Sequence, residues 1–156
     1  MYKKSDQLLQ RALESIPLAS QTFSKSLTQY PMGVSPFFIK EGRGSKVVDV
    51  DGNKYIDMTQ NGIGTSILGY ADDDVNHRVI EAINQGVNTT LNAPEEVELA
   101  QELLKLNPAM GSVKFARGGG EAMSIAVRIS RAHSKKDKVL FSGYHGWSDW
   151  YLASNL

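Results

Sequence analysis

The stretch VKFARGGGEAMSIAVRISRAHSKKDKVLFSGYHGW, residues 113–147, decides the expected fold. A short run at 113–116 reads as a strand, apolar residues at helical spacing predict a helix over 121–132, and 138–141 predicts a second strand. A strand, a helix and a second strand form the βαβ unit of an α/β protein. Two such strands leave a doubly wound sheet with an open edge and an uncovered face, so we expect an α/β fold with an incomplete sheet.

Three glycines, Gly118, Gly119 and Gly120, lie between the first strand and the helix. Backbone N–H groups and the helix dipole converge at such a turn, so a phosphate would fit there. The alternative is a tight turn that needs glycine for positive φ and binds nothing. Nucleotide binding is the weaker interpretation, because a dinucleotide motif would need glycine in place of Met123 and a Walker loop would need lysine in place of Glu121.

A second group of candidate residues, Tyr144, His145, Gly146 and Trp147, follows the second predicted strand. Its rings should therefore emerge at the same carboxyl edge of the sheet as the glycines, where open α/β sheets bind ligands. A flat ring could be stacked there. Alternatively, Tyr144 and Trp147 are ordinary core or rim aromatics and His145 is a hydrogen-bonded structural residue. The histidines show no metal-ligand spacing.

Upstream of this region, local signals predict helices and one hairpin. Helix starts are indicated by Ser5, by carboxylates and by proline, and helix ends by Pro17, Gly86 and Pro108. The expected elements are a helix over 5–16 with Ser5 as N-cap, a loop up to 39, a hairpin of strands 46–50 and 54–58, a helix from 72–74 to Gly86, and a helix from Pro94 that closes before Pro108.

Composition excludes several classes of function. Seventeen Lys and Arg balance seventeen Asp and Glu, so attraction to nucleic acid or to an anionic membrane is not expected. The absence of cysteine removes disulfides and thiolate nucleophiles. No stretch approaches the roughly 20 apolar residues of a membrane span, and the N-terminus has no leader-like apolar run. We expect a soluble, cytoplasmic protein with small-molecule partners.

Several motifs together resemble one enzyme family. Residues 113–147 resemble the segment of class III pyridoxal-phosphate-dependent aminotransferases in which a strand leads into Ser-Gly-Thr/Ser-Glu-Ala, a helix, a strand and Tyr-His-Gly. VVDVDGNKYIDM (47–58) is similar to the family's Asp-x-Asp-Gly-x-x-Tyr-x-Asp hairpin, and ILGYADDDV (67–75) to its Leu-Gly-His-x-x-Pro turn. APEEVELAQELLKLNP (93–108) and ESIPLASQTF (14–23) are similar to the glutamate-1-semialdehyde aminomutase branch.

This resemblance covers nearly the whole chain and implies the N-terminal part of a fold-type I transferase. Residues 1–60 would form the N-terminal helix and hairpin of the small domain, and residues 61–156 the truncated start of the large, cofactor-binding domain. The implied cofactor is pyridoxal 5'-phosphate. Its phosphate would be held at Gly118, Gly119 and Gly120, and its ring would stack on Tyr144.

The resemblance also implies a function for the full-length enzyme, a homodimer that moves an amino group from a small-molecule donor to a carbonyl acceptor through an aldimine and a ketimine. The family's Schiff-base lysine has no counterpart among the residues of this chain, so the chain alone is expected to be inactive and to carry no catalytic residue. The alternative is a non-catalytic remnant or binding protein that has lost the cofactor chemistry.

Four positions depart from the family pattern. Gly118 and Gly120 stand where the family has Ser and Thr or Ser, which removes two hydroxyl donors but leaves the backbone donors in place. Tyr70 replaces a common histidine, and Ile63 lies where the aminomutases carry tryptophan. A divergent aminotransferase is therefore favoured over a true glutamate-1-semialdehyde aminomutase.

Overall fold

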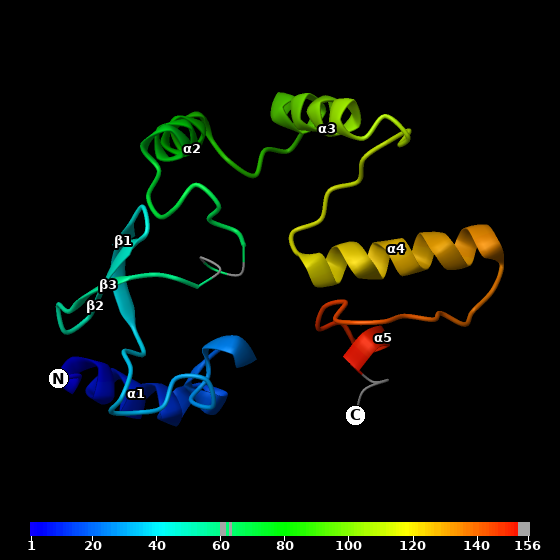
Figure 1. The fold of residues 1–156 in the computed structure, drawn as a ribbon. Coiled ribbons are helices and arrows are strands. Elements are labelled where there is room, and N and C mark those ends of the chain that lie inside the picture. Colours follow the sequence, from blue (N-terminus) through cyan, green and yellow to red (C-terminus); the bar gives the residue numbers. More distant parts are fainter. Residues whose placement is uncertain (60–61, 63, 153–156) are drawn as a thin grey trace. The chain divides into compact units, whose positions relative to one another are not determined.

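The computed structural model describes residues 1–59, 62 and 64–152, so Ile63 lies outside the described residues. The chain divides into two units, residues 1–88 and 89–156 (Figure 1). The division expected at residue 60 concerns the domains of a whole enzyme and stays a prediction. The elements are α1 (Lys3–Ser15), η1 (Pro17–Ala19), η2 (Phe23–Lys25), β1 (Ile39–Arg43), β2 (Lys46–Asp49), β3 (Lys54–Ile56), α2 (Asp73–Gln85), α3 (Pro94–Leu106), α4 (Gly119–Ser134) and α5 (Asp149–Leu152).

A three-stranded antiparallel sheet in the order β1-β2-β3 organises the first unit. The predicted hairpin is confirmed, since Val47 of β2 pairs with Tyr55 of β3. The segment predicted as loop up to residue 39 contains the short helices η1 and η2, and it is followed by strand β1, which was not predicted. Gly42 of β1 pairs with the other side of Val47. Because of its charged residues and its glycine, β1 has a low local propensity for strand, and pairing with β2 stabilises it as a strand.

Helix α1 carries the small core of the first unit. Leu9 is only 1% exposed and packs with Ala12 and Ala19, and the partly buried residues around this cluster are Ile16, Leu27, Phe37 and Phe38. The helix begins at Lys3, so the prediction that Ser5 is its N-cap is wrong. Ser5 is instead buried inside the first turn, where its hydroxyl accepts a hydrogen bond from the Phe37 N–H at 3.2 Å.

The cap of α1 comes from the hairpin. The carboxylate of Asp51 accepts hydrogen bonds from the N–H groups of Lys4 at 2.8 Å and Ser5 at 3.0 Å. A negative charge at this position also complements the positive end of the helix dipole. The turn between β2 and β3 therefore joins the sheet to the start of α1.

Asp49 holds that turn in shape. It is fully buried and accepts hydrogen bonds from the Asn53 N–H and Nδ2 (both 2.8 Å), the Asp51 N–H (2.9 Å) and the Tyr55 hydroxyl (3.0 Å). Burial alone would raise the pKa of Asp49, but the hydrogen bonds from Asn53, Tyr55 and Asp51 outweigh it and lower this pKa below its ordinary value of 3.8. The Asp-x-Asp-Gly motif of this chain thus has a structural role, because it shapes the turn between β2 and β3.

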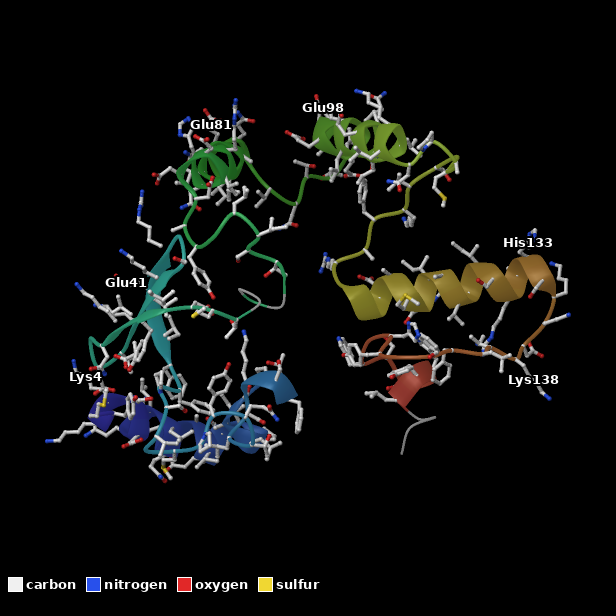
Figure 2. The ribbon with its side chains drawn as sticks, in the orientation of Figure 1. Lys4, Glu41, Glu81, Glu98, His133 and Lys138 are labelled. Atoms are coloured by element: carbon white, nitrogen blue, oxygen red, sulfur yellow. The ribbon has the colours of Figure 1, made fainter. Side chains whose placement is uncertain are left out.

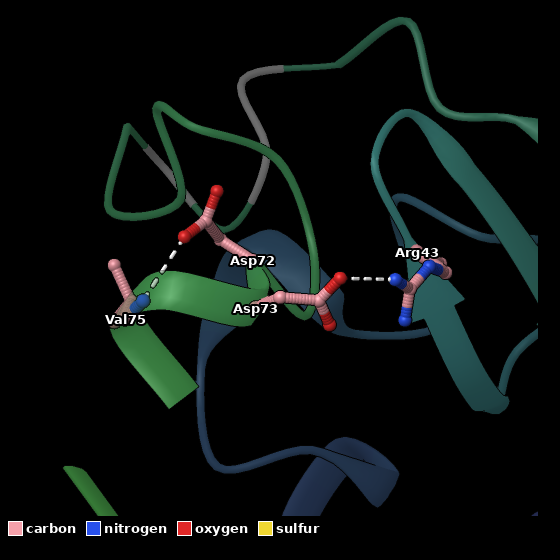
Figure 3. Close-up of polar contacts among 4 residues, drawn as sticks. All are labelled: Arg43, Asp72, Asp73 and Val75. Atoms are coloured by element: carbon pink, nitrogen blue, oxygen red, sulfur yellow. Dashed lines mark hydrogen bonds and ion pairs between the residues drawn. The ribbon is translucent and has the colours of Figure 1, made fainter. Parts of the chain in front are cut away.

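Helix α2 starts with carboxylates as predicted (Figure 3). The Asp72 side chain caps it by accepting the Val75 N–H at 3.0 Å, and Asp73 pairs with Arg43 of β1. The helix ends at Gly86, whose φ of 105° is easily reached only without a side chain. Both ends of this helix were therefore readable from local sequence.

Tyr70, the residue at the family's histidine position, is fixed within the first unit. Its backbone exchanges two hydrogen bonds of 2.8 Å with Gly44, and its hydroxyl donates to Asp57 at 2.6 Å. A Cβ on Gly42 would come within 2.8 Å of the Tyr70 ring, so glycine lets the ring lie against β1. Tyr70 therefore has a structural role in this unit.

In the second unit α3 has the predicted bounds, while α4 starts at Gly119, two residues before the predicted start. Figure 2 shows Glu98 on α3 and His133 close to the C-terminal end of α4. The predicted strands 113–116 and 138–141 are wrong, because the structure has no strand in either segment. A strand needs ladder partners, and the described residues of this unit provide none. No helix among the described residues is long and apolar enough to cross a membrane.

Candidate functional site

The three glycines form the N-terminal boundary of α4. Gly118 is the N-cap in extended conformation, with φ −160°, and Gly119 and Gly120 are the first two helical residues. None of the three has a positive φ, so the alternative that the turn needs glycine for a left-handed conformation is wrong. A Cβ on Gly118 or Gly119 would meet nothing within 4 Å. The space above these two residues is open.

Three backbone donors remain at this helix start. The first intrahelical hydrogen bond runs from the Ala122 N–H to the Gly118 carbonyl at 3.0 Å. Among the described residues, none accepts from the N–H groups of Gly119, Gly120 or Glu121. Gly120 is also buried, and a buried N–H without a partner costs about 1–3 kcal/mol. An anion from outside the chain would satisfy these donors and the helix dipole together.

The Glu121 side chain does not cap its own helix. Its carboxylate accepts a hydrogen bond from the Arg117 N–H at 2.8 Å, one residue before the N-cap. The acidic group is thereby turned towards the preceding segment and leaves the first-turn donors of α4 unoccupied. A carboxylate that did cap the helix would compete with any anionic ligand.

The structure brings the glycine turn (residues 118–120) into contact with the aromatic turn (residues 144–147). A Cβ on Gly146 would lie 2.6 Å from the Gly120 Cα and 3.2 Å from the Gly120 nitrogen, so the two backbones touch where only glycine fits. Gly146 also has a φ of 97°, which disfavours any other residue. We predicted that both motifs lie at one sheet edge, but the structure has no strand at 113–116 or 138–141, and direct backbone contact joins the motifs instead.

Two serines secure this contact. The hydroxyls of Ser148, at 3.1 Å, and Ser124, at 2.9 Å, both donate to the Gly120 carbonyl, and the Trp150 indole N–H donates to the Ser124 hydroxyl at 3.2 Å. Sequence reasoning missed both serines. A serine four residues along a helix often bonds back to the carbonyl of the earlier turn, so Ser124 carries no distinctive signal of its own.

Tyr144 and Trp147 lie within two residues of Gly146 in the sequence. Tyr144 is 75% exposed and Trp147 72% exposed, which excludes the interpretation of either as a core residue. Tyr144 packs edge-on against the buried Tyr151, with ring centroids 5.9 Å apart. His145 bonds through Nε2 to the Ser142 carbonyl at 2.7 Å, as expected of a structural histidine. Tyr144 thus presents an available ring face close in sequence to Gly146.

The described residues contain no group of three or more His, Cys, Asp or Glu side chains that could hold a metal ion. The candidate site offers backbone donors, an open approach at Gly118 and Gly119, and exposed aromatic rings. This combination suits a ligand that carries an anionic group and a flat ring.

Known proteins share this arrangement of sequence and fold. The family model for aminotransferase class-III matches residues 29–155. Glutamate-1-semialdehyde 2,1-aminomutase of Methanosphaera stadtmanae is 34% identical over 154 residues, which are 97% of this chain and 35% of that protein. A 3-aminobutyryl-CoA aminotransferase of Cloacimonas acidaminovorans is 38% identical over 119 residues, 76% of this chain and 28% of that protein. A solved structure described as a transaminase with PLP bound has a TM-score of 0.85 at 30% identity. The match covers 96% of this chain and 34% of the chain in that structure.

These matches confirm the expected fold, an α/β architecture of the fold-type I transferases with an incomplete sheet. The chain spans about a third of the length of the proteins it matches. The resemblance drawn from the glycine turn, the aromatic turn and the hairpin is also confirmed, because the matched residues include all three. The chain belongs to the class III aminotransferase family.

Proposed function

We propose that the start of α4 binds the phosphate of pyridoxal 5'-phosphate, at Gly118, Gly119 and Gly120, and that Tyr144 contacts the cofactor ring. The observation that carries the proposal is the buried Gly120 N–H, which has no acceptor among the described residues. A phosphate supplies several strong acceptor oxygens and a negative charge, and the helix start supplies donors and a positive dipole end.

The residues present fit this cofactor, with one difference from the family. The open space at Gly118 and Gly119 admits a bulky anion, and the exposed ring of Tyr144 follows within the adjoining turn. Serine and threonine hydroxyls are replaced by glycine, so the phosphate would rely more on backbone donors. Each hydrogen bond to a charged group contributes about 1.5–3 kcal/mol, so affinity should be lower than in relatives with both hydroxyls.

The cofactor would supply an electron sink for chemistry next to an amino group. The part of this chain is binding: α4 holds the anionic end and Tyr144 supports the ring. We extend this to amino-group transfer between a small-molecule donor and a carbonyl acceptor in a longer, homodimeric, cytoplasmic protein. Support comes from the family and from relatives named as aminotransferases and aminomutases. This chain alone is predicted to show no transaminase turnover.

The test uses ligands that cannot form Schiff bases with surface lysines. Pyridoxamine 5'-phosphate and pyridoxamine, which lacks the phosphate, are titrated separately into the chain while tryptophan fluorescence is recorded. Both tryptophans, Trp147 and Trp150, lie in the aromatic turn or directly after it. We expect saturable quenching by the phosphate ester at least tenfold tighter than by pyridoxamine, with inorganic phosphate competing. Equal affinity of the two ligands would contradict the proposal.

A further inference from the structure

The Gly120 carbonyl accepts more hydrogen bonds than helix formation requires. Its partners outside the backbone are the hydroxyls of Ser124, at 2.9 Å, and Ser148, at 3.1 Å. One serine belongs to α4 and the other follows the aromatic turn. Both converge on the single peptide group that joins Gly120 to Glu121.

That peptide group also carries one of the open donors. A peptide unit is planar and trans, so the Gly120 carbonyl and the Glu121 N–H point in opposite directions. Fixing the orientation of the Gly120 carbonyl therefore fixes that of the Glu121 N–H. In a helix this N–H points towards the N-terminal end. Donation to the carbonyl also polarises the peptide, which strengthens its N–H as a donor.

The indole of Trp150 adds a further link. Its N–H donates to the Ser124 hydroxyl at 3.2 Å, which occupies an acceptor site on that oxygen and leaves its proton for the Gly120 carbonyl. The chain of donors runs from Trp150 through Ser124 to Gly120. The close approach of Gly146 brings the segment that carries Ser148 into range.

We propose that Ser124 and Ser148 are positioning residues of the phosphate site: they fix the Gly120–Glu121 peptide so that the Glu121 N–H points to the bound anion. The inference rests on the proposed function, since it assumes that the start of α4 binds phosphate. It adds two side chains that touch neither phosphate nor ring and yet set the affinity for the phosphate.

The experiment compares Ser148→Ala and Ser124→Ala with two controls in the whole chain. Ser130→Ala changes an exposed serine on the same helix, and Ser148→Thr keeps a hydroxyl. Affinities for pyridoxamine 5'-phosphate and pyridoxamine are measured by tryptophan fluorescence, and folding is checked by circular dichroism. The Glu121 amide shift is followed by NMR in the unliganded variants.

We expect Ser148→Ala and Ser124→Ala each to weaken pyridoxamine 5'-phosphate binding roughly three- to tenfold, with pyridoxamine affinity unchanged. The Glu121 amide proton should move upfield as the peptide loses a donor. Ser130→Ala and Ser148→Thr should resemble the parent chain. Alanine variants that fold and bind the phosphate ester as the parent does would overturn the inference alone. A parent chain that does not distinguish the two ligands would overturn the proposed function and the inference together.

Discussion

Helices α1 and α4 present the same set of backbone donors at their starts, and the chain treats them in opposite ways. At α1 the carboxylate of Asp51 accepts from the N–H groups of Lys4 and Ser5. At α4 no described residue accepts from Gly119 or Gly120, and the nearest carboxylate, on Glu121, bonds back to the segment before the helix. One start is closed by an anion of the chain, and the other is open to an anion from solution.

The difference shows how sequence separates a structural helix start from a binding one. Closing α1 takes a carboxylate from 46 residues away, held by a turn that Asp49 organises. Leaving α4 open takes only the absence of a capping side chain at its start. The start of α4 therefore differs from that of α1 in that no described residue accepts from its first N–H groups.

The largest expected effect comes from removing Asp49, which shapes the turn that carries Asp51. Asp49→Ala removes the acceptor of four hydrogen bonds in a fully buried position. Several donors would then be buried without partners, so the free energy of unfolding of the first unit should fall by about 3 kcal/mol or more. Urea denaturation measures the loss. Asp49→Asn, which keeps one acceptor oxygen, should lose less.

The second prediction concerns the contact that shapes the open end. Gly146→Ala places a Cβ 2.6 Å from the Gly120 Cα at a φ of 97°. The free energy of unfolding of the second unit should therefore fall by about 2 kcal/mol. Gly143→Ala is the matched control, because Gly143 also has a positive φ of 81° but nothing within 4 Å of its Cβ. Equal destabilisation by the two variants would show that backbone strain, and not the approach to Gly120, sets the effect.

Acid should weaken the hydrogen bonds that two carboxylates of the first unit, Asp49 and Asp57, accept. The side-chain hydrogen bonds of Thr59 and Tyr70 lower the pKa of Asp57, as those of Asn53 lower the pKa of Asp49 against the effect of burial. Because both folded pKa values lie below the ordinary 3.8, their contribution is complete above that pH and is lost as pH falls through the folded values. Urea denaturation at pH 7 and below pH 3.8 should show this loss, smaller than that of Asp49→Ala. A stability independent of pH in that range would contradict the assignment.

The local signals explain how much of this the sequence could predict. The Asp51-Gly52-Asn53 turn, the Asp72 cap, Gly86 and Pro94 act within a few residues, and the hairpin, α2 and α3 were predicted from them. The predicted strands at 113–116 and 138–141 failed because strand formation depends on partners that no local pattern supplies. The cap of α1 was assigned to Ser5 for the same reason, since its true acceptor lies far along the chain.

The candidate site was predictable as motifs and not as an arrangement. Three glycines before a helix and a Tyr-His-Gly-Trp turn are visible in the sequence. Their meeting at Gly120 and Gly146 is a tertiary contact, as are the bonds from Ser148 and Trp150. None of the three glycines has the positive φ that the tight-turn alternative required.

A hydroxyl added at the start of α4 should strengthen the binding of an anion there. Gly118→Ser adds the donor that the family carries, into space where a Cβ meets nothing within 4 Å. Affinity for pyridoxamine 5'-phosphate should rise about tenfold, the lower end of a hydrogen bond to a charged group. Gly118→Ala adds the Cβ without the hydroxyl and should leave affinity unchanged. Fluorescence titration distinguishes them, and a gain shared by both variants would argue against a hydroxyl contact.

The smallest effect is expected from the cap of α1. Asp51→Ala removes the acceptor of the Lys4 and Ser5 N–H groups. The free energy of unfolding of the first unit should therefore fall by about 1 kcal/mol. Asp51→Asn keeps an oxygen and should lose less. Hydrogen exchange at Lys4 and Ser5 measures the cap directly, and unchanged protection in the alanine variant would show that α1 does not depend on Asp51.

The most direct test of the open helix start is a two-dimensional amide NMR titration of the chain with pyridoxamine 5'-phosphate. Binding at α4 predicts large shift changes at the Gly119, Gly120 and Glu121 amides, accompanied by changes in the turn that carries Tyr144, and no comparable change at Lys4 or Ser5. Saturable changes centred elsewhere, with the three α4 amides unmoved, would contradict the account.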